Sequence, residues 1–261
     1  MRSPTSPPVL LLVEANWDLR HILHQVLVDQ GYAVMAAASL EQALRLVHRQ
    51  PVDLILTDLF TSAGQESLAH LLPLQKLAHG IPIVVVATWL TTRDVEQQGF
   101  SGPLSKPFGV NDLILRVAAG LNQPFSTDQL RQAEVIKRYV AGLNARDMEG
   151  LVAVCTEHVR FYPWYVPPYP AARPFTGRVA LRAFYEELFG YLHDLTLELC
   201  QLYPCPYGLA ARLLFRWRTD EGAFTQQIVG CCFHISGEQI SQVGIPTSRD
   251  ERLAALLGAS H

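Results

Sequence analysis

The chain has 261 residues, of which 49% are hydrophobic and 17% are charged, a balance typical of globular domains. Its net charge of -3 argues against a nucleic-acid-binding protein, and no apolar stretch is long enough to cross a membrane. The five cysteines show no metal-ligand spacing, and residues 1–8 lack the pattern of a secretion signal. The sequence therefore predicts a cytoplasmic protein with a disordered N-terminal segment, residues 1–8, and no contact with nucleic acid or membranes.

The first half of the chain alternates short apolar runs with segments of helical periodicity. The runs at 9–13, 54–56 and 81–87 are typical of strands that are buried on both faces of a parallel sheet. Apolar residues at helical spacing predict helices around 19–27, 39–47, 67–78, 93–99 and 111–121, with a further strand at 32–36. Such alternation predicts an α/β fold with a doubly wound, parallel, five-stranded sheet.

Polar side chains follow the predicted strands, at the edge where open α/β sheets place their sites. Glu14 follows the first run, Asp58 ends the stretch Pro51-Val-Asp-Leu-Ile-Leu-Thr-Asp58, Thr88 follows the third run, and Lys106 lies before Pro107-Phe108. A single aspartate in such a place would more often cap the next helix. The order of acid, acid, hydroxyl and lysine favours a shared site.

This order and the Lys106-Pro107-Phe108 triplet resemble the receiver domain of two-component response regulators, over roughly residues 7–122. The resemblance implies that Asp58 accepts a phosphoryl group, that Lys106 pairs with the phosphoryl oxygens, and that Glu14 and Asp58 help to hold Mg²⁺. It also implies a protein partner, a histidine kinase or another signalling protein.

Two departures from the family pattern weaken that site. Ala15 replaces the second acid, and a methyl group cannot bind Mg²⁺. Alignment on Pro82 puts Ala87 at the position of the switch hydroxyl, with Thr88 one residue late. We therefore expect weak Mg²⁺ binding, no other cofactor, and a degenerate receiver that works mainly as an interaction module. A conventional receiver, phosphorylated at Asp58, is the alternative.

The second half begins after a predicted linker at 122–127. Ser126 and Gln129 form a capping box, and a helical stripe follows through Leu143. Later the period switches to two, which predicts antiparallel strands at 195–202, 210–219, 224–235 and 239–245. Helices followed by strands predict an α+β domain. We set the limits at 9–121 for the receiver-like domain and 128–258 for the second domain.

The motifs Asn144-x-x-Asp147-x-x-x-Leu151 and Gly177-x-x-Ala180-x-x-Phe184-Tyr185, followed by the strand meander, resemble the nuclear transport factor 2-like fold. This family includes SnoaL-like polyketide cyclases and ketosteroid isomerases. The resemblance implies a cone-shaped domain with an apolar pocket, and pairing of two copies through the open face of the sheet. We therefore expect a homodimer held by the second domain.

Four side chains are candidates for lining that pocket: Tyr162, Tyr185, Trp217 and His234. The isomerases have an aspartate before a proline where this chain has Tyr162-Pro163, and a tyrosine is a poor base at neutral pH. A histidine in a half-buried strand is more often simply hydrogen-bonded than catalytic. We therefore assign no catalytic residue and expect a non-catalytic domain that binds a small apolar ligand or a protein. A SnoaL-like cyclase or isomerase with a regulatory receiver is the remaining alternative.

Overall fold

The structure, a computed structural model, describes residues 6–59, 68–88, 90–163, 175–218 and 222–245. It divides into two compact units, with the change of unit between Asn122 and Gln123, and each unit is described by itself. Parts of the predicted limits, residues 1–5 and 246–258, lie outside the described residues. Within the described residues, no helix is both long and apolar enough to cross a membrane.

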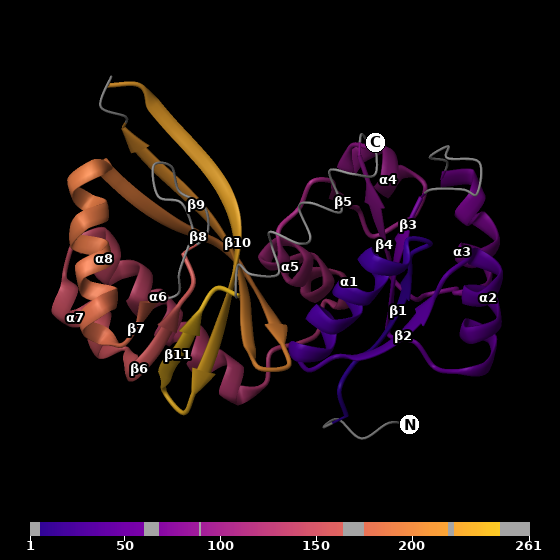
Figure 1. Ribbon diagram of the computed structural model, residues 1–261, viewed down its shortest axis with the longest axis horizontal. Coiled ribbons are helices and arrows are strands. Elements are labelled where there is room, and N and C mark those ends of the chain that lie inside the picture. Colours follow the sequence, from indigo (N-terminus) through magenta and orange to yellow (C-terminus); the bar gives the residue numbers. More distant parts are fainter. Residues whose placement is uncertain (1–5, 60–67, 89, 164–174, 219–221, 246–261) are drawn as a thin grey trace. The chain divides into compact units, whose positions relative to one another are not determined.

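The first unit is an α/β sandwich around a parallel sheet of five strands in the order β2-β1-β3-β4-β5 (Figure 1). This arrangement confirms the predicted doubly wound sheet. Its elements are β1 (Val9–Val13), α1 (Trp17–Asp29), β2 (Ala33–Ala37), α2 (Leu40–Arg49), β3 (Leu54–Asp58), a 3₁₀ turn (Leu68–Leu71), α3 (Leu72–Leu77), β4 (Ile83–Ala87), α4 (Thr92–Gln97), β5 (Pro103–Ser105) and α5 (Val110–Leu121).

Local sequence signals account for most of these boundaries. Ser39 caps α2 by accepting a hydrogen bond from the Gln42 backbone N–H, as the capping-box pattern predicts. Pro73 lies in the first turn of α3, where a missing N–H costs little, and a 3₁₀ turn replaces the earlier part of the predicted helix.

Helix α5 begins one residue before the predicted range of 111–121. Gly109 occupies the cap position, and its backbone N–H donates to the Asp112 carboxylate at 3.3 Å. The helix therefore begins at Val110, one residue before Asn111, and the Asn111 side chain is buried instead of capping the helix end.

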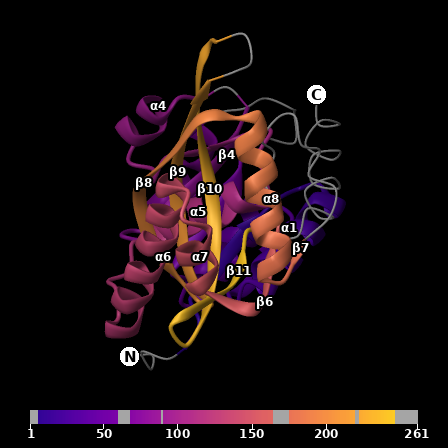
Figure 2. The ribbon, with the colours of Figure 1, turned by 90° about the vertical axis from the view of Figure 1, so that its left-hand side faces the viewer.

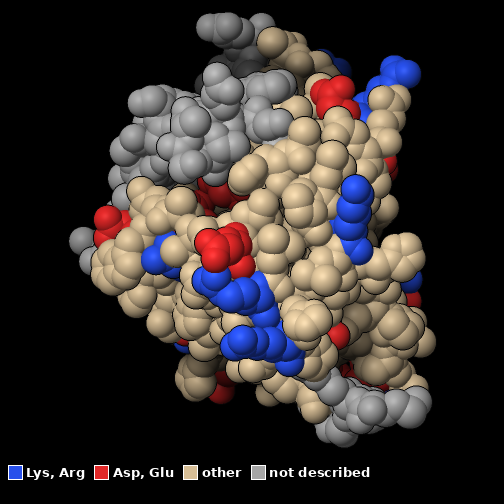
Figure 3. All heavy atoms as spheres, turned by 90° about the vertical axis from the view of Figure 1, so that its right-hand side faces the viewer, with Lys and Arg blue, Asp and Glu red and all other residues tan. Residues whose placement is uncertain are grey.

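Charged side chains of both signs lie side by side on the face of the molecule in Figure 3, and most of that face is neither basic nor acidic. An exposed ion pair of the first unit joins Arg45 and Glu41 on α2.

The second unit packs three helices against a curved sheet of six strands in the order β7-β6-β11-β10-β9-β8 (Figure 1). Figure 2 shows α6, α7 and α8 on one side of this sheet. Neighbouring strands are antiparallel except β11 and β6, which are parallel. The elements are α6 (Thr127–Ala145), α7 (Met148–Ala153), β6 (Cys155–Phe161), β7 (Phe175–Thr176), α8 (Arg178–Tyr191), β8 (His193–Cys205), β9 (Gly208–Arg218), β10 (Phe224–Ser236) and β11 (Gln239–Val243).

Strand β9 shows how the period-two pattern builds the core of this unit. Leu213, Phe215 and Trp217 alternate onto the face that the helices cover, and all three are buried. They share one apolar cluster with Ile136 of α6 and Phe184 of α8. This face of β9 therefore points inward. Burial of such side chains contributes ~1.5–3 kcal/mol each.

Candidate functional site

The first candidate site lies at the carboxyl edge of the parallel sheet, where the sequence pattern places it. Val13 of β1 pairs in register with Thr57 of β3. The next residues, Glu14 and Asp58, therefore lie at the carboxyl ends of neighbouring strands. The backbone N–H of Lys106 donates to the Ala87 carbonyl at 2.8 Å, which fixes the lysine beside the end of β4.

Asp58 and Lys106 form a buried ion pair at this edge. Lys106 Nζ donates to Asp58 Oδ2 at 2.5 Å, and the two side chains are only 2% and 8% exposed. Buried charges are stable only when they are paired in this way, because each has lost its hydration. The predicted acceptor and the predicted lysine therefore meet, and the lysine already neutralises the carboxylate.

Glu14 completes the acidic part of the site. Its Oε1 accepts a hydrogen bond from the Asn16 backbone N–H at 2.8 Å. Burial, the charge of Asp58 and a hydrogen bond with Asp58 together raise the pKa of the Glu14 carboxyl to about 8, although the Asn16 N–H and Lys106 act in the opposite direction. Glu14 is therefore mostly protonated at neutral pH.

Arg20 of α1 is part of the site although no sequence signal singled it out. Its Nη1 donates to the Glu14 carbonyl at 2.5 Å and to the Ala15 carbonyl at 3.0 Å. The loop after β1 therefore holds a guanidinium group beside the position where Ala15 replaces an acid. An arginine at the start of the helix that follows such an acid is a weak signal, because most surface arginines are simply solvated.

This set of groups does not fit Mg²⁺ well. Asp58 is paired with Lys106, Ala15 supplies no oxygen ligand from its side chain, and Arg20 donates to two carbonyl oxygens of the loop. Hard cations need charged or free oxygen ligands. Across the part of the chain that the structure describes, no cluster of three or more His, Cys, Asp or Glu side chains could hold a metal ion.

Thr88 lies just beyond the last residue of β4. Ala87 is the residue that pairs in register with Ser105 of β5 and accepts the Lys106 N–H. The position next to the lysine therefore carries a methyl group, and the hydroxyl of Thr88 is displaced by one residue.

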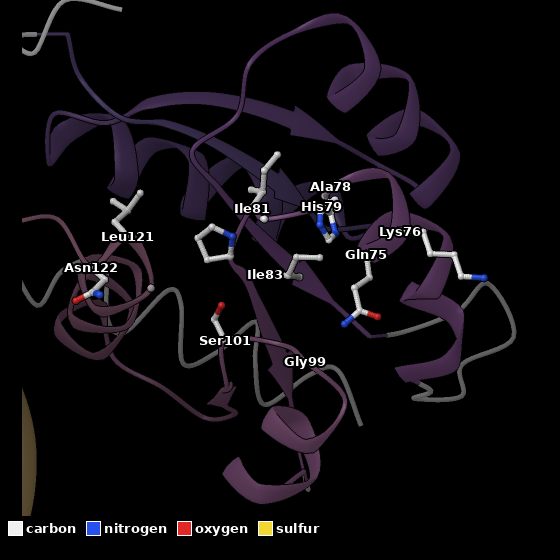
Figure 4. Close-up of a pocket in the computed structure, with 13 residues that line it drawn as sticks. Gln75, Lys76, Ala78, His79, Ile81, Ile83, Gly99, Ser101, Leu121 and Asn122 are labelled. Atoms are coloured by element: carbon white, nitrogen blue, oxygen red, sulfur yellow. The ribbon is translucent and has the colours of Figure 1, made fainter. Parts of the chain in front are cut away.

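This unit also has a hollow of about 690 Å³, which opens at the edge of the sheet opposite to the Asp58 group (Figure 4). It lies among the turns before β4 and β5 and the end of α5, and Gln75, His79, Ser101 and Asn122 contribute to its lining. This edge carries the amino ends of the strands, so the hollow does not include the Asp58 group.

The structure does not bring the four pocket candidates of the second unit together. Trp217 and Tyr185 are buried in the apolar cluster. Tyr162 follows the core residue Phe161, and His234 follows the core residue Phe233, so both point away from that cluster. His234 instead lies 5.9 Å from the Tyr207 ring, measured between ring centroids.

The interior of this unit contains a hydroxyl pair that the sequence did not reveal. Tyr139 Oη and Tyr185 Oη are 2.5 Å apart, and both side chains are fully buried. Burial raises the pKa of each phenol well above its usual value. The pair can therefore donate a hydrogen bond but cannot act as a base at neutral pH.

No described carboxylate is buried in the second unit, where the buried polar side chains include Gln242. Among the other polar candidates, His158 is exposed, and Asp194 is exposed and pairs with Arg218 at 3.2 Å. The side chain of His193 lies outside the described residues. The described interior therefore offers hydrogen-bond donors but no group that is suited to remove a proton from carbon.

Comparison of the sequence with family models gives one match within each of the two units. Residues 10–118 match the family "Response regulator receiver domain", and residues 136–243 match the family "SnoaL-like domain". The fold and the two matches thus define a two-domain protein. The chain contains a response regulator receiver domain followed by a SnoaL-like domain.

Curated relatives match part of the chain. Transcriptional regulatory protein GlrR of Escherichia coli is 29% identical over 153 residues, which cover 56% of this chain and 34% of that protein. Probable transcriptional regulator ycf29 of Pyropia yezoensis is 28% identical over 177 residues, which cover 59% of this chain and 79% of that protein. The chain spans about a third of the length of the Escherichia coli relatives.

Solved structures resemble each half separately. The chemotaxis response regulator CheY4 of Vibrio cholerae is 22% identical, with a TM-score of 0.39, and covers 44% of this chain and 98% of that one. Rv0760c of Mycobacterium tuberculosis, solved with estradiol-17beta-hemisuccinate, is 17% identical, with a TM-score of 0.38, and covers 44% of this chain and 91% of that one. At these scores the likenesses carry no conclusion about function.

Proposed function

We propose that this chain is an atypical response regulator of the cytoplasm, in which a degenerate receiver works mainly as a protein-interaction module. Its partner is a histidine kinase or another signalling protein. The receiver family match and the two-component relatives support the signalling role. All five cysteines are free thiols, which suits a reducing compartment.

The observation that carries this proposal is the state of the Asp58 carboxylate. In conventional phosphoryl transfer, a metal ion neutralises the charge that develops on the transferring group. Here Lys106 already occupies the carboxylate, Glu14 holds a proton, and Ala15 offers no ligand. Phosphorylation would have to break a buried ion pair without the aid of a well-held cation. We therefore infer that Asp58 is phosphorylated slowly.

The test is labelling with acetyl phosphate in Mg²⁺, for the wild type and for Ala15→Asp. We expect little labelling of the wild type, and more labelling of Ala15→Asp because a second carboxylate restores a metal ligand. Asp58→Ala is the control for label at other sites. Full Mg²⁺-dependent labelling of the wild type that disappears in Asp58→Ala would instead establish the conventional, phosphorylated receiver.

For the SnoaL-like domain we propose a non-catalytic role in binding a small apolar molecule or a protein. The absence of a buried carboxylate from its described interior supports this role, because proton abstraction from carbon needs a positioned base. Calorimetry with apolar ring compounds tests binding, and product analysis with ring-forming and isomerisable ketones tests turnover. We expect heat of binding without product.

One observation favours the alternative, an isomerase or cyclase. The Tyr139–Tyr185 pair places phenolic donors in a dry, aromatic interior, and such donors stabilise an oxygen that becomes negative during a reaction. Turnover that is lost in Tyr185→Phe, Tyr162→Phe or His234→Ala would establish the enzyme. The binding role requires no reaction by any of these three side chains. The same three variants therefore also serve as its controls.

A further inference from the structure

Arg20 brings a second cation to the carboxyl edge of the receiver sheet, in addition to Lys106. It lies near the start of α1 and folds back onto the loop that follows β1. Its Nη1 donates to the Glu14 carbonyl oxygen at 2.5 Å and to the Ala15 carbonyl oxygen at 3.0 Å. This is the loop to which the receiver resemblance assigns acidic metal ligands.

The charge of Arg20 has no acidic partner among the described residues. Its guanidinium group donates to the two loop carbonyl oxygens, and none of the described carboxylates pairs with it. Lys106 differs in this respect, because Asp58 neutralises it directly. Ala15, whose carbonyl oxygen Arg20 contacts, stands where the family pattern has an acid. The loop therefore holds a cation at the place where it has lost a carboxylate.

This cation changes what the loop can bind. Mg²⁺ is held through carboxylates and other oxygen atoms. The Ala15 side chain supplies no oxygen, and the carbonyl oxygens of Glu14 and Ala15 already accept hydrogen bonds from Arg20. A divalent cation beside the guanidinium group would also meet like-charge repulsion. Solvent screens this repulsion only in part, because Arg20 is half-buried.

We propose that Arg20 closes the receiver site to Mg²⁺. Together with Lys106 it supplies positive charge of the kind that a metal ion supplies in conventional phosphoryl transfer. Lys106 neutralises Asp58, and Arg20 holds the loop after β1 through its carbonyl oxygens. The inference rests on the proposed degenerate receiver, and it adds a second cause of weak metal binding to the loss of the acid at Ala15.

The test compares Mg²⁺ binding by the wild type, Ala15→Asp, Arg20→Met and the double variant Ala15→Asp/Arg20→Met. Titration of the full chain with MgCl₂, followed by two-dimensional amide NMR, gives the affinity and shows whether each variant is folded. We expect no saturable binding by the wild type or by Arg20→Met, because both lack the acid at position 15. Ala15→Asp should bind, and the double variant should bind about 3- to 10-fold more tightly, because one nearby positive charge has been removed.

Two further variants separate the charge of Arg20 from its hydrogen bonds. Ala15→Asp/Arg20→Lys keeps the charge and should bind Mg²⁺ like Ala15→Asp. Ala15→Asp/Arg45→Met is the matched control, because Arg45 is an exposed arginine of α2 that pairs with Glu41. It should also bind like Ala15→Asp. Equal affinity of the Arg20→Lys and Arg20→Met double variants would overturn the role of the charge.

The outcomes distinguish a failure of this inference from a failure of the proposed function. Equal affinity of Ala15→Asp and Ala15→Asp/Arg20→Met would overturn the role of Arg20 and leave the degenerate receiver in place. Weaker binding by the double variant would also overturn it, because Arg20 would then be needed to order the loop. Saturable binding of Mg²⁺ by the wild type, as tight as that of Ala15→Asp, would overturn both.

Discussion

Lys106 Nζ and Asp58 Oδ2 lie 2.5 Å apart at the carboxyl edge of the receiver sheet, although 48 positions separate the two residues in the chain. Each is the counter-charge of the other in a site that excludes most solvent. The pair therefore couples the ends of β3 and β5. Replacing one partner should lower the stability, because the other charge stays buried without its counter-charge. Replacing both partners should cost much less stability.

Lys106→Met tests this coupling. The change leaves Asp58 buried without its cation, so we expect a loss of about 3–5 kcal/mol in the free energy of unfolding of the receiver. Urea denaturation of the full chain, followed by circular dichroism, measures it. The double variant Asp58→Asn/Lys106→Met should recover part of the loss. Lys76→Met, on the exposed face of α3, is the control and should change the free energy by less than about 0.5 kcal/mol.

The Tyr139–Tyr185 pair supports a second prediction, for the SnoaL-like domain. Tyr185→Phe removes one hydroxyl and leaves the Tyr139 hydroxyl buried without this partner, which should cost about 1–3 kcal/mol. The double variant Tyr139→Phe/Tyr185→Phe removes both groups and should be closer to the wild type in stability. Thermal and urea denaturation of Tyr139→Phe, Tyr185→Phe and the double variant measure the cycle. Additive losses would show that the two hydroxyls do not depend on each other.

The sequence predicted the parts of the fold that depend on neighbouring residues. The apolar runs of β1, β3 and β4, the Ser39 cap and the Ser126 capping box are local signals, and they correspond to the observed elements. The start of α5 was misplaced because the Asp112 carboxylate and the Asn111 amide are both capable caps. The backbone around Gly109, which decided between them, is not visible in the sequence.

The candidate site was predictable in its polar groups but not in their pairing. Strand ends placed Glu14, Asp58 and Lys106 at one edge, because parallel strands in a sheet share that edge. Periodicity carries no information about Arg20 folding back onto the β1 loop, or about Tyr139 meeting Tyr185 across 46 residues. Such contacts depend on tertiary packing, which also decided that His234 points away from the core.

The outer face of the SnoaL-like sheet leads to a prediction about assembly. Ile228 of β10 is 53% exposed and pairs in register with Leu214 of β9, which in turn pairs with Glu198 of β8. We propose that this face joins two copies of the chain, because burial of such apolar side chains favours association. Light scattering of the full chain should report twice the mass of one copy.

Ile228→Asp should shift that mass towards a single copy, because it places a charge in the contact. Val179→Asp is the matched control, since Val179 is 84% exposed on α8, on the helical side of the sheet. It should leave the mass unchanged. A wild type that remains a single copy at high concentration would contradict the dimer.

The last prediction concerns pH and rests on His234. Burial lowers the pKa of His234 from 6.5 to about 4 in the folded chain, so the unfolded chain binds the proton more tightly. The stabilising contribution of the neutral imidazole is therefore complete above the unfolded pKa and is lost as the pH falls through the folded pKa. Between about pH 7.5 and about pH 5, we expect a loss of about 2 kcal/mol from this residue.

Urea denaturation at the two pH values measures this loss in the transition of the SnoaL-like domain. His234→Gln should remove the pH-dependent part, because an amide does not titrate in this range, and should reduce the difference between the two pH values. His158→Gln, an exposed histidine of β6, should keep the difference seen in the wild type. If His234→Gln retained the full difference, the loss would have to come from another group. The partly buried His234 would then not be the group that limits the stability of this domain in acid.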